Sequence, residues 1–441
     1  MTDRNRADIL RDIEALVDEW QDAAPPEEFV AGETVIPYGG RVYDASEVKA
    51  AVRSSLDFWL TLGPYGEQLE ARLAEYLAVQ HVSLVNSGSS ANLLALASLT
   101  SHKLDKPLMP GDEVVTSALG FPTTVNPIYQ YGLTPVYIDA EQSTYVPSPA
   151  QVEAAVTAKT RAVFLAHTLG NPFDVDGIRQ VCADHDLYLI EDNCDALGSL
   201  YKGKRTGGFG AVATQSFYPP HHMTMGEGGA VMTNDKQLKC VVDSFRDWGR
   251  DCWCPSGKDD TCKRRFKWRL GQLPRGYDHK YIYSHIGYNL KPLDIQAAIG
   301  LAQMDKLPVF EAARRRNFAT LREALRPFEK WLILPEATAD TDPCWFGFLM
   351  VVRDTAPFGR DELVAHLEGN KVQTRMLFGG NLTRQPAYLG RNHRIASPLN
   401  VADLVMNNGF FIGVYPGLTQ EMIEYVIAAL LGFLNDRERA K

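Results

Sequence analysis

Two adjacent histidines, His221 and His222, are the residues of this chain best suited to proton transfer. They stand between the run 216–220 (SFYPP) and the glycine-rich turn 226–229 (GEGG). Imidazole gains and loses a proton near neutral pH, so either side chain could serve as a general acid or base. A histidine taken alone is more often a satisfied core or surface residue, and only its surroundings decide between these interpretations.

The seven cysteines fall into two groups. Cys182, Cys240 and Cys344 stand alone in patterned segments, which is typical of buried apolar positions. The second group joins one distant residue to a Cys-Trp-Cys pair and a later cysteine: Cys194, Cys252, Cys254 and Cys262. A structural zinc ion is the usual alternative, but zinc ribbons and fingers pair their cysteines closely at both ends. Four thiolates also suit a two-iron, two-sulfur cluster, which this spacing favours.

Three further positions lie where strands are expected to end. The small-residue turn 86–92 (NSGSSAN) precedes a helix, so its amides and hydroxyls could cap that helix or enclose a phosphate. Asp192 ends the run 189–192 (LIED), where an acid commonly caps the next helix. Cys194 follows only two residues later, so at about 3.3 Å per residue a metal there would lie beside any ligand of Asp192. Phe121, taken alone, is most simply a core residue.

Seven short apolar runs must position these residues. They cover residues 81–85, 113–117, 135–139, 162–167, 187–191, 211–217 and 230–233, with helical segments between most of them. Such runs suit strands that are buried on both faces of a mostly parallel sheet. Ligands of open α/β sheets bind at the carboxyl ends of the strands, and the candidate residues lie just past those ends. A helix over residues 294–304 closes this region.

The same pattern predicts the domain organisation and the class of protein. A helical arm over 1–60, with an amphipathic helix expected to pack on the body, precedes a large domain over 61–310. That domain contains an insertion at about 250–280, and a smaller domain covers 311–441. The hydrophobic content of 45% is globular, and the net charge of −9 argues against nucleic-acid binding. With neither a secretory signal nor a run long enough to span a membrane, a cytoplasmic enzyme is expected.

These segments resemble the DegT/DnrJ/EryC1/StrS sugar aminotransferases, in which a lysine at the position of His221 holds pyridoxal phosphate as a Schiff base. The resemblance implies an α/β protein of PLP-dependent transferase fold type I, like aspartate aminotransferase. Its large domain would hold a mostly parallel seven-stranded sheet, and its small C-terminal domain would be α+β. The cofactor would meet Gly88, Ser89, Ser90 and Ser216 at its phosphate, Phe121 on its ring, Asp192 at its pyridine nitrogen, and Asn289 from the partner subunit of a homodimer.

Histidine at position 221 changes what this resemblance implies for catalysis. Imidazole cannot form a stable Schiff base, so the cofactor would be held non-covalently, most usefully as pyridoxamine 5′-phosphate (PMP). His221 would still move protons. Counting from Ser216 puts His221 at the family's lysine position, which leaves His222 a supporting part.

A narrower resemblance rests on His221, the four spaced cysteines and the strings 245–251 (FRDWGRD), 276–281 (GYDHKY), 346–348 (FGF) and 381–386 (NLTRQP). Together they resemble the iron-sulfur branch of the family, the CDP-4-keto-6-deoxy-D-glucose 3-dehydrases. This implies a 2Fe-2S cluster on the four cysteines and a separate NADH-dependent iron-sulfur flavoprotein reductase. The substrate would be a nucleotide-linked 4-keto-6-deoxyhexose that loses its C3 hydroxyl during 3,6-dideoxyhexose biosynthesis.

Several alternatives remain open on the sequence. The chain could be a plain PLP-dependent sugar aminotransferase, a GDP-sugar 3-dehydratase without a cluster, or a catalytically inactive relative that binds cofactor or zinc. The nucleotide of the substrate could be CDP, TDP or GDP. The insertion is basic, and it is either simply solvated or docks an acidic electron donor or the substrate diphosphate: Lys263, Arg264, Arg265, Lys267, Arg269 and Arg275.

Overall fold

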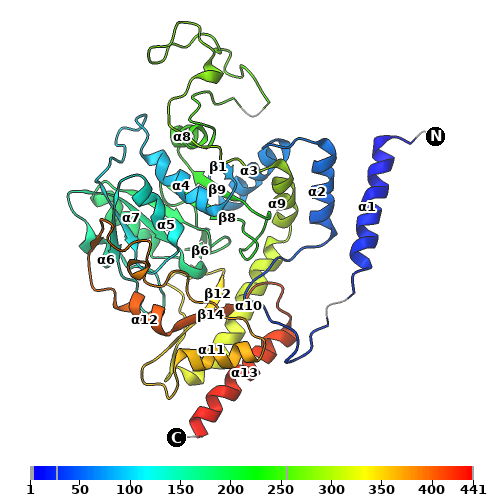
Figure 1. Ribbon diagram of the computed structural model, residues 1–441, viewed down its shortest axis with the longest axis vertical. Coiled ribbons are helices and arrows are strands. Elements are labelled where there is room, and N and C mark those ends of the chain that lie inside the picture. The colour runs from blue at the N-terminus through cyan, green and yellow to red at the C-terminus, as the bar shows by residue number, and fades with distance from the viewer. Residues whose placement is uncertain (1–3, 26–27, 255–256, 440–441) are drawn as a thin grey trace.

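A central sheet organises the computed structural model, which describes residues 4–25, 28–254 and 257–439 (Figure 1). Within these residues the sheet has eight strands in the order β1-β9-β8-β5-β4-β2-β3-β13. The pairs from β8 through to β13 are parallel, and β9 is antiparallel to both of its neighbours. The strands are β1 (His81–Val85), β2 (Glu113–Ser117), β3 (Thr134–Ile138), β4 (Thr160–Ala166), β5 (Tyr188–Asp192), β8 (Val212–Ser216), β9 (Gly229–Thr233) and β13 (Arg394–Ile395).

All seven apolar runs predicted from the sequence form strands of this sheet, with bounds that are identical for β1 and β2 and differ by one or two residues for the others. The sheet differs from the prediction by its eighth strand, β13, which comes from the C-terminal part of the chain. Arg394 of β13 pairs with Val136 of β3, and its guanidinium donates to Glu113 at 2.8 and 3.0 Å. Two residues are too few to leave a periodic signal in the sequence.

Helices cover both faces of the sheet because alternate residues of a strand point to opposite sides. Val114 and Phe164 pack with α4 (Gly88–Leu99) and α8 (Lys236–Arg246). Val115 and Leu165 pack on the other face, with α6 (Pro149–Ala155) and α7 (Val175–Asp184). The remaining helices of this region are α3 (Pro64–Leu77), α5 (Pro122–Gln130) and α9 (Asp294–Met304), the last with the bounds predicted from the sequence.

The C-terminal part forms a smaller α+β unit around the antiparallel sheet β10-β12-β14. Phe348 and Met350 of β12 face the helices of this unit, whereas Leu349 and Val351 pack against Leu119 of the large domain and its neighbours. The small unit is therefore fixed beside the carboxyl ends of the large sheet. Its elements are α10 (Leu307–Leu325), β10 (Leu332–Ile333), β12 (Gly347–Val352), α11 (Arg360–Gly369), α12 (Asn400–Asn408), β14 (Gly409–Gly413) and α13 (Gln420–Arg439).

Short elements complete the fold. A second three-stranded sheet has the order β11-β6-β7. Its strands and the 3-10 helices of the described chain are β6 (Leu200–Tyr201), β7 (Lys204–Arg205), β11 (Thr341–Asp342), η1 (Thr168–Gly170), η2 (His279–Tyr281), η3 (Arg326–Phe328) and η4 (Leu382–Arg384).

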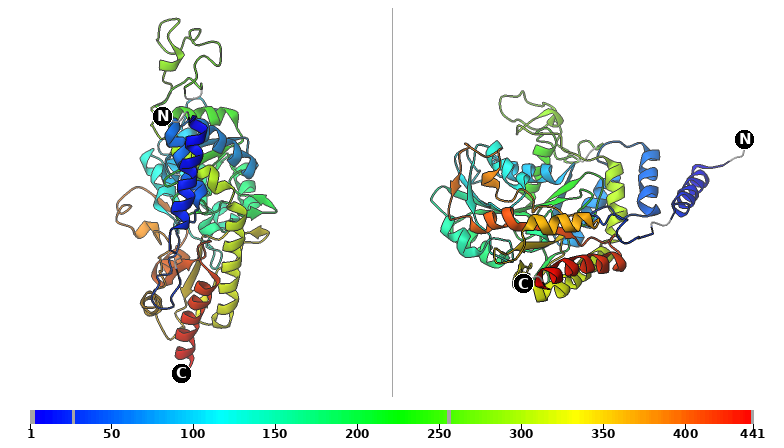
Figure 2. Two further views of the ribbon diagram at one scale, coloured as in Figure 1. Left: turned by 90° about the vertical axis from the view of Figure 1, so that its right-hand side faces the viewer. Right: turned by 60° about the horizontal axis from the view of Figure 1, so that its bottom comes forward.

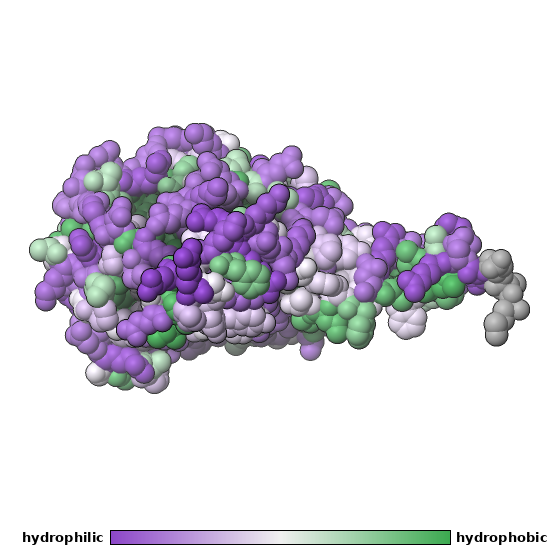
Figure 3. Space-filling model, turned by 90° about the horizontal axis from the view of Figure 1, so that it is seen from above, coloured by the Kyte–Doolittle hydropathy of each residue, from purple (hydrophilic) through white to green (hydrophobic). Residues whose placement is uncertain are grey.

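The first helix of the N-terminal arm stands away from the body (Figure 2), whereas the second helix of the arm packs on α9. Helix α1 (Arg6–Asp22) contains no buried residue and contacts α2 (Ala45–Asp57), where Asp18 pairs with Lys49 at 2.5 Å. The expected packing of this helix on the body is therefore limited to α2. Apolar side chains remain visible along the arm (Figure 3). Ile9, Leu16 and Trp20 of α1 are all exposed. In the described ranges, no helix has the length and apolarity needed to cross a bilayer.

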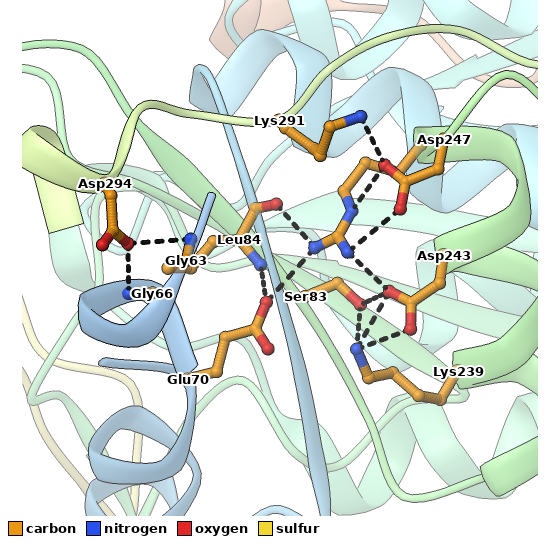
Figure 4. A network of polar contacts seen from close by, with 11 residues as sticks. Gly63, Gly66, Glu70, Ser83, Leu84, Lys239, Asp243, Asp247, Lys291 and Asp294 are labelled. Atoms are coloured by element: carbon orange, nitrogen blue, oxygen red, sulfur yellow. Dashed lines mark hydrogen bonds and ion pairs between the residues drawn. The ribbon is translucent and has the colours of Figure 1, made fainter. Parts of the chain in front are cut away.

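The insertion projects from the body next to α8 and has little regular structure apart from η2 (Figures 1 and 2). Residues 255 and 256 of the predicted insertion lie outside the described residues. A charged network holds the two ends of the insertion against the body (Figure 4). Arg246, the last residue of α8, donates to Glu70 of α3 at 3.2 Å and to the carbonyl of Leu84 in β1 at 3.1 Å. Beyond the insertion, Lys291 donates to Asp247 at 3.0 Å.

The isolated cysteines do not all follow the expectation of burial. Cys182 and Cys344 are buried, but Cys240 is exposed. The buried residues of α8 recur at Leu238, Val241, Val242 and Phe245, which form one face of the helix. Cys240 falls on the other side of that helix, so the prediction for it was wrong.

Candidate active site

A pocket of about 260 Å³ opens at the carboxyl ends of the parallel strands, against the C-terminal unit. Most of the residues predicted to form the site line it together, although they come from four different strand ends: Gly88, Ser89, Phe121, Asp192, Cys194, Ser216 and His221. The predicted residues that do not line this pocket are Ser90, Asn289, Cys252, Cys254 and Cys262.

The turn between β1 and α4 has the geometry of an anion cradle. Ser87 caps α4 by accepting the backbone N–H of Ser90 at 3.1 Å, and its hydroxyl also contacts the Ser90 hydroxyl. Ser90 is thereby engaged inside the first turn. A Cβ at Gly88 would lie 2.4 Å from the Cβ of Ser216, so only glycine allows this close approach. The helix N-terminus, Ser89 and Ser216 together fit a phosphate group.

Asp192 is held at the end of β5 by three hydrogen bonds. Its Oδ2 accepts from the amide of Asn92 at 2.9 Å and from the hydroxyl of Thr124 at 2.6 Å. Its Oδ1 accepts from the backbone N–H of Cys194 at 3.2 Å. Asn92 is itself oriented by the Thr214 hydroxyl, which donates to its Oδ1 at 2.6 Å. A carboxylate fixed in this way, at the edge of the pocket, fits the protonated nitrogen of a pyridine ring.

Sequence reasoning missed Asn92 and Thr124 as functional residues. Asn92 lies one helical turn after Gly88, on the same face of α4, and this spacing is the one signal that could have identified it. Phe121 is 48% exposed and contacts Phe378 edge-on, with ring centroids 5.8 Å apart. Its ring lines the pocket, as an aromatic that stacks on a cofactor must.

His221 is enclosed on several sides. Its side chain is 14% exposed, and its ring centroid lies 5.2 Å from that of Phe346. Its Nδ1 lies 3.7 Å from Oδ1 of Asp195 and has no hydrogen-bond partner among the described residues. Burial lowers the pKa of His221 to about 4. Burial, followed by the negative charge of Asp192, raises the pKa of Asp195 to about 8. Near neutral pH the imidazole is therefore neutral and Asp195 carries a proton.

The backbone around His221 is fixed by Arg314 of α10, another residue that sequence reasoning missed. Its guanidinium donates to the carbonyls of Pro220 at 3.3 Å and His221 at 3.0 Å, and to the carbonyl of Trp345 at 3.2 Å. His222 points elsewhere: it is buried, and its Nε2 donates to the carbonyl of Cys344 at 2.7 Å. Of the two histidines, only His221 lines the pocket.

The four spaced cysteines do not share one cavity: one lines the active-site pocket, two line a second cavity, and Cys262 lines neither of them. Cys194 lines the active-site pocket, where burial and the Asp192 and Asp195 carboxylates raise the pKa of its thiol well above the usual range. Cys252 and Cys254 line a separate cavity of about 480 Å³ at the base of the insertion.

Within the insertion, the thiol of Cys254 ionises more readily than an ordinary cysteine thiol. Burial acts to raise the pKa of Cys254, but a hydrogen bond of 3.1 Å from the Thr261 hydroxyl and further donors lower it overall. Burial raises the pKa of Cys252 to about 11. No group of three or more His, Cys, Asp or Glu residues within the described ranges is arranged to hold a metal ion. In this conformation the four thiols do not form a cluster site.

Asn289 also lies outside the pocket of its own chain. Its side-chain oxygen accepts from Lys291 at 2.9 Å, and its backbone forms a β-bridge with Asp247. Asn289 therefore lies beside the charged network at the ends of the insertion, and it is not part of the phosphate cradle formed by this chain.

Comparison with known proteins agrees with this geometry. The model of the DegT/DnrJ/EryC1/StrS aminotransferase family matches residues 42–431. The lipopolysaccharide biosynthesis protein RfbH of Salmonella typhimurium is 50% identical over 415 residues, which cover 94% of this chain and 95% of that protein. The dTDP-4-dehydro-2,6-dideoxy-D-glucose 3-dehydratase of Saccharopolyspora spinosa is 51% identical over 92% of this chain and 88% of its own length.

Solved structures agree on the fold. The E. coli GDP-4-keto-6-deoxy-D-mannose-3-dehydratase with bound hydrated PLP superposes with a TM-score of 0.81 at 27% identity, covering 90% of this chain and 100% of that one. The same type of enzyme with bound GDP-perosamine also gives a TM-score of 0.81 at 27% identity, over 89% and 99% of the two chains. The predicted aminotransferase-like α/β fold is confirmed, and the chain belongs to the DegT/DnrJ/EryC1/StrS aminotransferase family.

Proposed function

We propose that the chain is a PMP-dependent 3-dehydratase of a nucleotide-linked 4-keto-6-deoxyhexose, with CDP-4-keto-6-deoxy-D-glucose as its substrate. One observation carries this proposal: a neutral, enclosed His221 occupies the catalytic position, and the described residues that line the pocket include no lysine. Without a lysine the enzyme cannot store its cofactor as a covalent Schiff base, which ordinary transamination uses. Two relatives named as sugar 3-dehydratases support the reaction type.

Each end of the cofactor would meet a matching part of the pocket. Gly88, Ser89 and Ser216 would hold the phosphate, Phe121 would stack on the ring, and Asp192 would accept a hydrogen bond from the protonated pyridine nitrogen. Bound in this way, PMP supplies an amine that condenses with the sugar ketone and a ring that withdraws electrons from the reacting carbons.

The protein would supply proton transfer. His221 is neutral near pH 7, so its ring can accept a proton from the cofactor's C4′ carbon and pass it to the departing C3 oxygen. The protonated carboxyl of Asp195 faces Nδ1 of the same ring, where it steadies the imidazole and can return a proton to it. Phe346 excludes water from one side of the ring.

A 2Fe-2S cluster on Cys194, Cys252, Cys254 and Cys262, served by an NADH-dependent iron-sulfur flavoprotein reductase, is the second part of the proposal. Cys194 lies next to Asp192, and the thiol of Cys254 ionises more readily than an ordinary cysteine. Because the thiols are separated in this conformation, the insertion of this chain or of a partner subunit must approach the pocket for the cluster to form.

The exposed end of the insertion is suited to docking an acidic reductase. Arg265 is already paired with Asp278 at 2.6 Å, and Arg264 stacks on Trp268 at 4.5 Å. The other four basic residues between 263 and 275 form no ion pair within the described residues: Lys263, Lys267, Arg269 and Arg275. We further propose a cytoplasmic homodimer in which Asn289 serves the phosphate of the partner subunit, since it does not line its own pocket.

A turnover experiment tests the reaction. Anaerobically purified protein, reconstituted with iron, sulfide and PMP, would receive CDP-4-keto-6-deoxyglucose, NADH and a flavin reductase, and the products would be analysed for loss of the C3 oxygen. The dTDP-linked sugar is a second candidate because a relative with 51% identity is named for a dTDP substrate. Borohydride reduction that joins the cofactor covalently to wild-type protein loaded with the aldehyde form, PLP, would overturn the proposal. The variant His221→Lys is the positive control for that linkage.

Metal analysis tests the cluster separately. Two iron and two sulfide ions per chain, with loss of the visible absorbance in each of the variants Cys194→Ser, Cys252→Ser, Cys254→Ser and Cys262→Ser, would support it. Cys182 of α7 is buried in the core and lies outside the set, so Cys182→Ser is the control. Zinc in place of iron, or a full iron content in the Cys194→Ser variant, would contradict the four-cysteine cluster.

A further inference from the structure

Arg375 is the only lysine or arginine among the described residues that line the active-site pocket. Its side chain is exposed, and no carboxylate in the described ranges lies within ion-pair distance of it. The pocket otherwise offers carboxyl groups, hydroxyls and aromatic rings. An unpaired cation at the edge of such a pocket attracts an anionic part of whatever binds there.

The guanidinium is held in a defined position. The backbone of Arg375 forms a β-bridge with Phe411, with N···O distances of 2.9 and 2.7 Å. The guanidinium lies 4.2 Å from the ring centroid of Tyr38, an aromatic platform that an arginine can stack on. Tyr38 is itself fixed by an edge contact to Phe411 and by close packing of its backbone on Gly413.

Most of the hydrogen-bonding capacity of this side chain is unused. A guanidinium has five N–H donors. In the described residues, Arg375 uses one of them, from Nη1 to the carbonyl of Thr374 at 2.7 Å. Four donors therefore remain for a ligand, in the planar arrangement that binds phosphate oxygens in pairs.

This group lies on a different wall of the pocket from the phosphate cradle. The cradle of Gly88, Ser89 and Ser216 belongs to the large domain, whereas Arg375 and Tyr38 lie against β14 of the C-terminal unit. The pocket thus has two separate places for phosphate groups. One molecule of PMP fills only the first of them.

We infer that Arg375, stacked on Tyr38, binds the diphosphate of the nucleotide-sugar substrate. This inference rests on the proposed function, because it takes the substrate to be a nucleoside diphosphate sugar. It goes further by naming the residue that recognises the charged part of that substrate. The sugar would then extend from Arg375 toward His221 and the cofactor.

Ligand binding without turnover tests this role. Binding of CDP and of cytidine to the PMP-loaded protein would be measured by calorimetry, in parallel with dTDP and thymidine. The variant Arg375→Ala should weaken binding of the diphosphates on the order of 10- to 100-fold and leave the affinity for the nucleosides unchanged. Arg375→Lys keeps the charge but loses the paired donors, so it should give an intermediate loss. Arg391→Ala removes an exposed arginine that does not line the pocket, and it is the matched control for net charge.

Variants of Tyr38, the aromatic residue on which Arg375 stacks, test the role of Arg375 independently. Tyr38→Phe retains the ring under Arg375 and should bind CDP as the wild type does, whereas Tyr38→Leu should lose several-fold in affinity. Thermal unfolding and a titration with PMP would show that each variant is folded and loaded.

Two results would overturn the assignment of Arg375. The first is that Arg375→Ala binds both nucleoside diphosphates as tightly as the wild type does. The second is that Arg375→Ala loses affinity for PMP and not for the nucleoside diphosphates, which would assign Arg375 to the cofactor phosphate. Failure of the wild type to remove the C3 oxygen from any sugar would refute the proposed function alone, since the binding measurements do not depend on turnover.

Discussion

The Nδ1 atom of His221 lies 3.7 Å from Oδ1 of Asp195, and the two groups are both uncharged near neutral pH. This pair combines an imidazole whose pKa burial lowers to about 4 with a carboxyl whose pKa burial raises to about 8. The base is therefore ready to accept a proton, and a proton donor stands beside it.

The pH profile of catalysis should report this pair. As the pH rises through about 8, Asp195 ionises, and the imidazole of His221 loses the proton donor that stands beside it. The value of kcat/KM should therefore fall above pH 8, and it should not fall between pH 7 and 5 through titration of His221. The variant Asp195→Asn, which cannot ionise, should lose the alkaline fall. An acid limb of kcat/KM near the ordinary histidine pKa of about 6.5, present in both the wild type and Asp195→Asn, would contradict the lowered pKa.

The contact between Gly88 and Ser216 should control cofactor affinity. Gly88→Ala would place a methyl group 2.4 Å from the Cβ of Ser216 and push the two sides of the cradle apart. We expect the dissociation constant of PMP to rise on the order of 10-fold, as measured by absorbance titration. Gly432→Ala, where a Cβ would meet open space within α13, is the control and should bind PMP normally. Equal PMP affinity in the two variants would argue against the cradle.

The hydroxyl of Thr124 should influence the rate through Asp192. Thr124→Val has a similar shape but removes the 2.6 Å hydrogen bond to Oδ2, so the carboxylate is less firmly oriented toward the ring nitrogen. A fall in kcat of about 10- to 100-fold is expected, with a change in the absorbance of bound PMP that a purely structural role would not produce. Thr320→Val, on the exposed side of α10, provides the control. An unaltered spectrum together with normal kcat would remove Thr124 from the site.

Arg246 should hold the insertion to the body. Arg246→Met removes the cation that pairs with the partly buried Glu70, and it removes one of the two cations that pair with each of Asp243 and Asp247 (Figure 4). Lys239 and Lys291 remain as the second partners of these two aspartates. The free energy of unfolding should fall by about 3 kcal/mol, measured by denaturant titration, and limited proteolysis within 250–280 should become faster. Arg384→Ala removes an exposed arginine from an ion pair and should cost less than about 1 kcal/mol. A similar loss in the two variants would show that the network does not fix the insertion.

The sequence alone determined the main sheet and most of the site. Seven buried strands could be recognised because strands covered on both faces are continuously apolar, and the site residues could be grouped because parallel strands end at one edge. The strand β13 escaped detection because two residues carry no period. The exposure of Cys240 was missed because a single cysteine does not reveal which face of α8 it occupies.

Only the tertiary structure decided how these residues act together. Asp195, Arg314 and Arg375 gain their roles from contacts with residues far away in the chain, and no local pattern encodes such contacts. The low pKa of His221 likewise comes from burial, which depends on how the C-terminal unit packs over the strand ends. The four spaced cysteines illustrate the same point. Their spacing in the sequence suggested that they bind one metal cluster, but the distances between their thiols depend on where the fold places the insertion. Local sequence sets the conformation and polarity of each segment, but proximity between distant segments arises only when the chain packs.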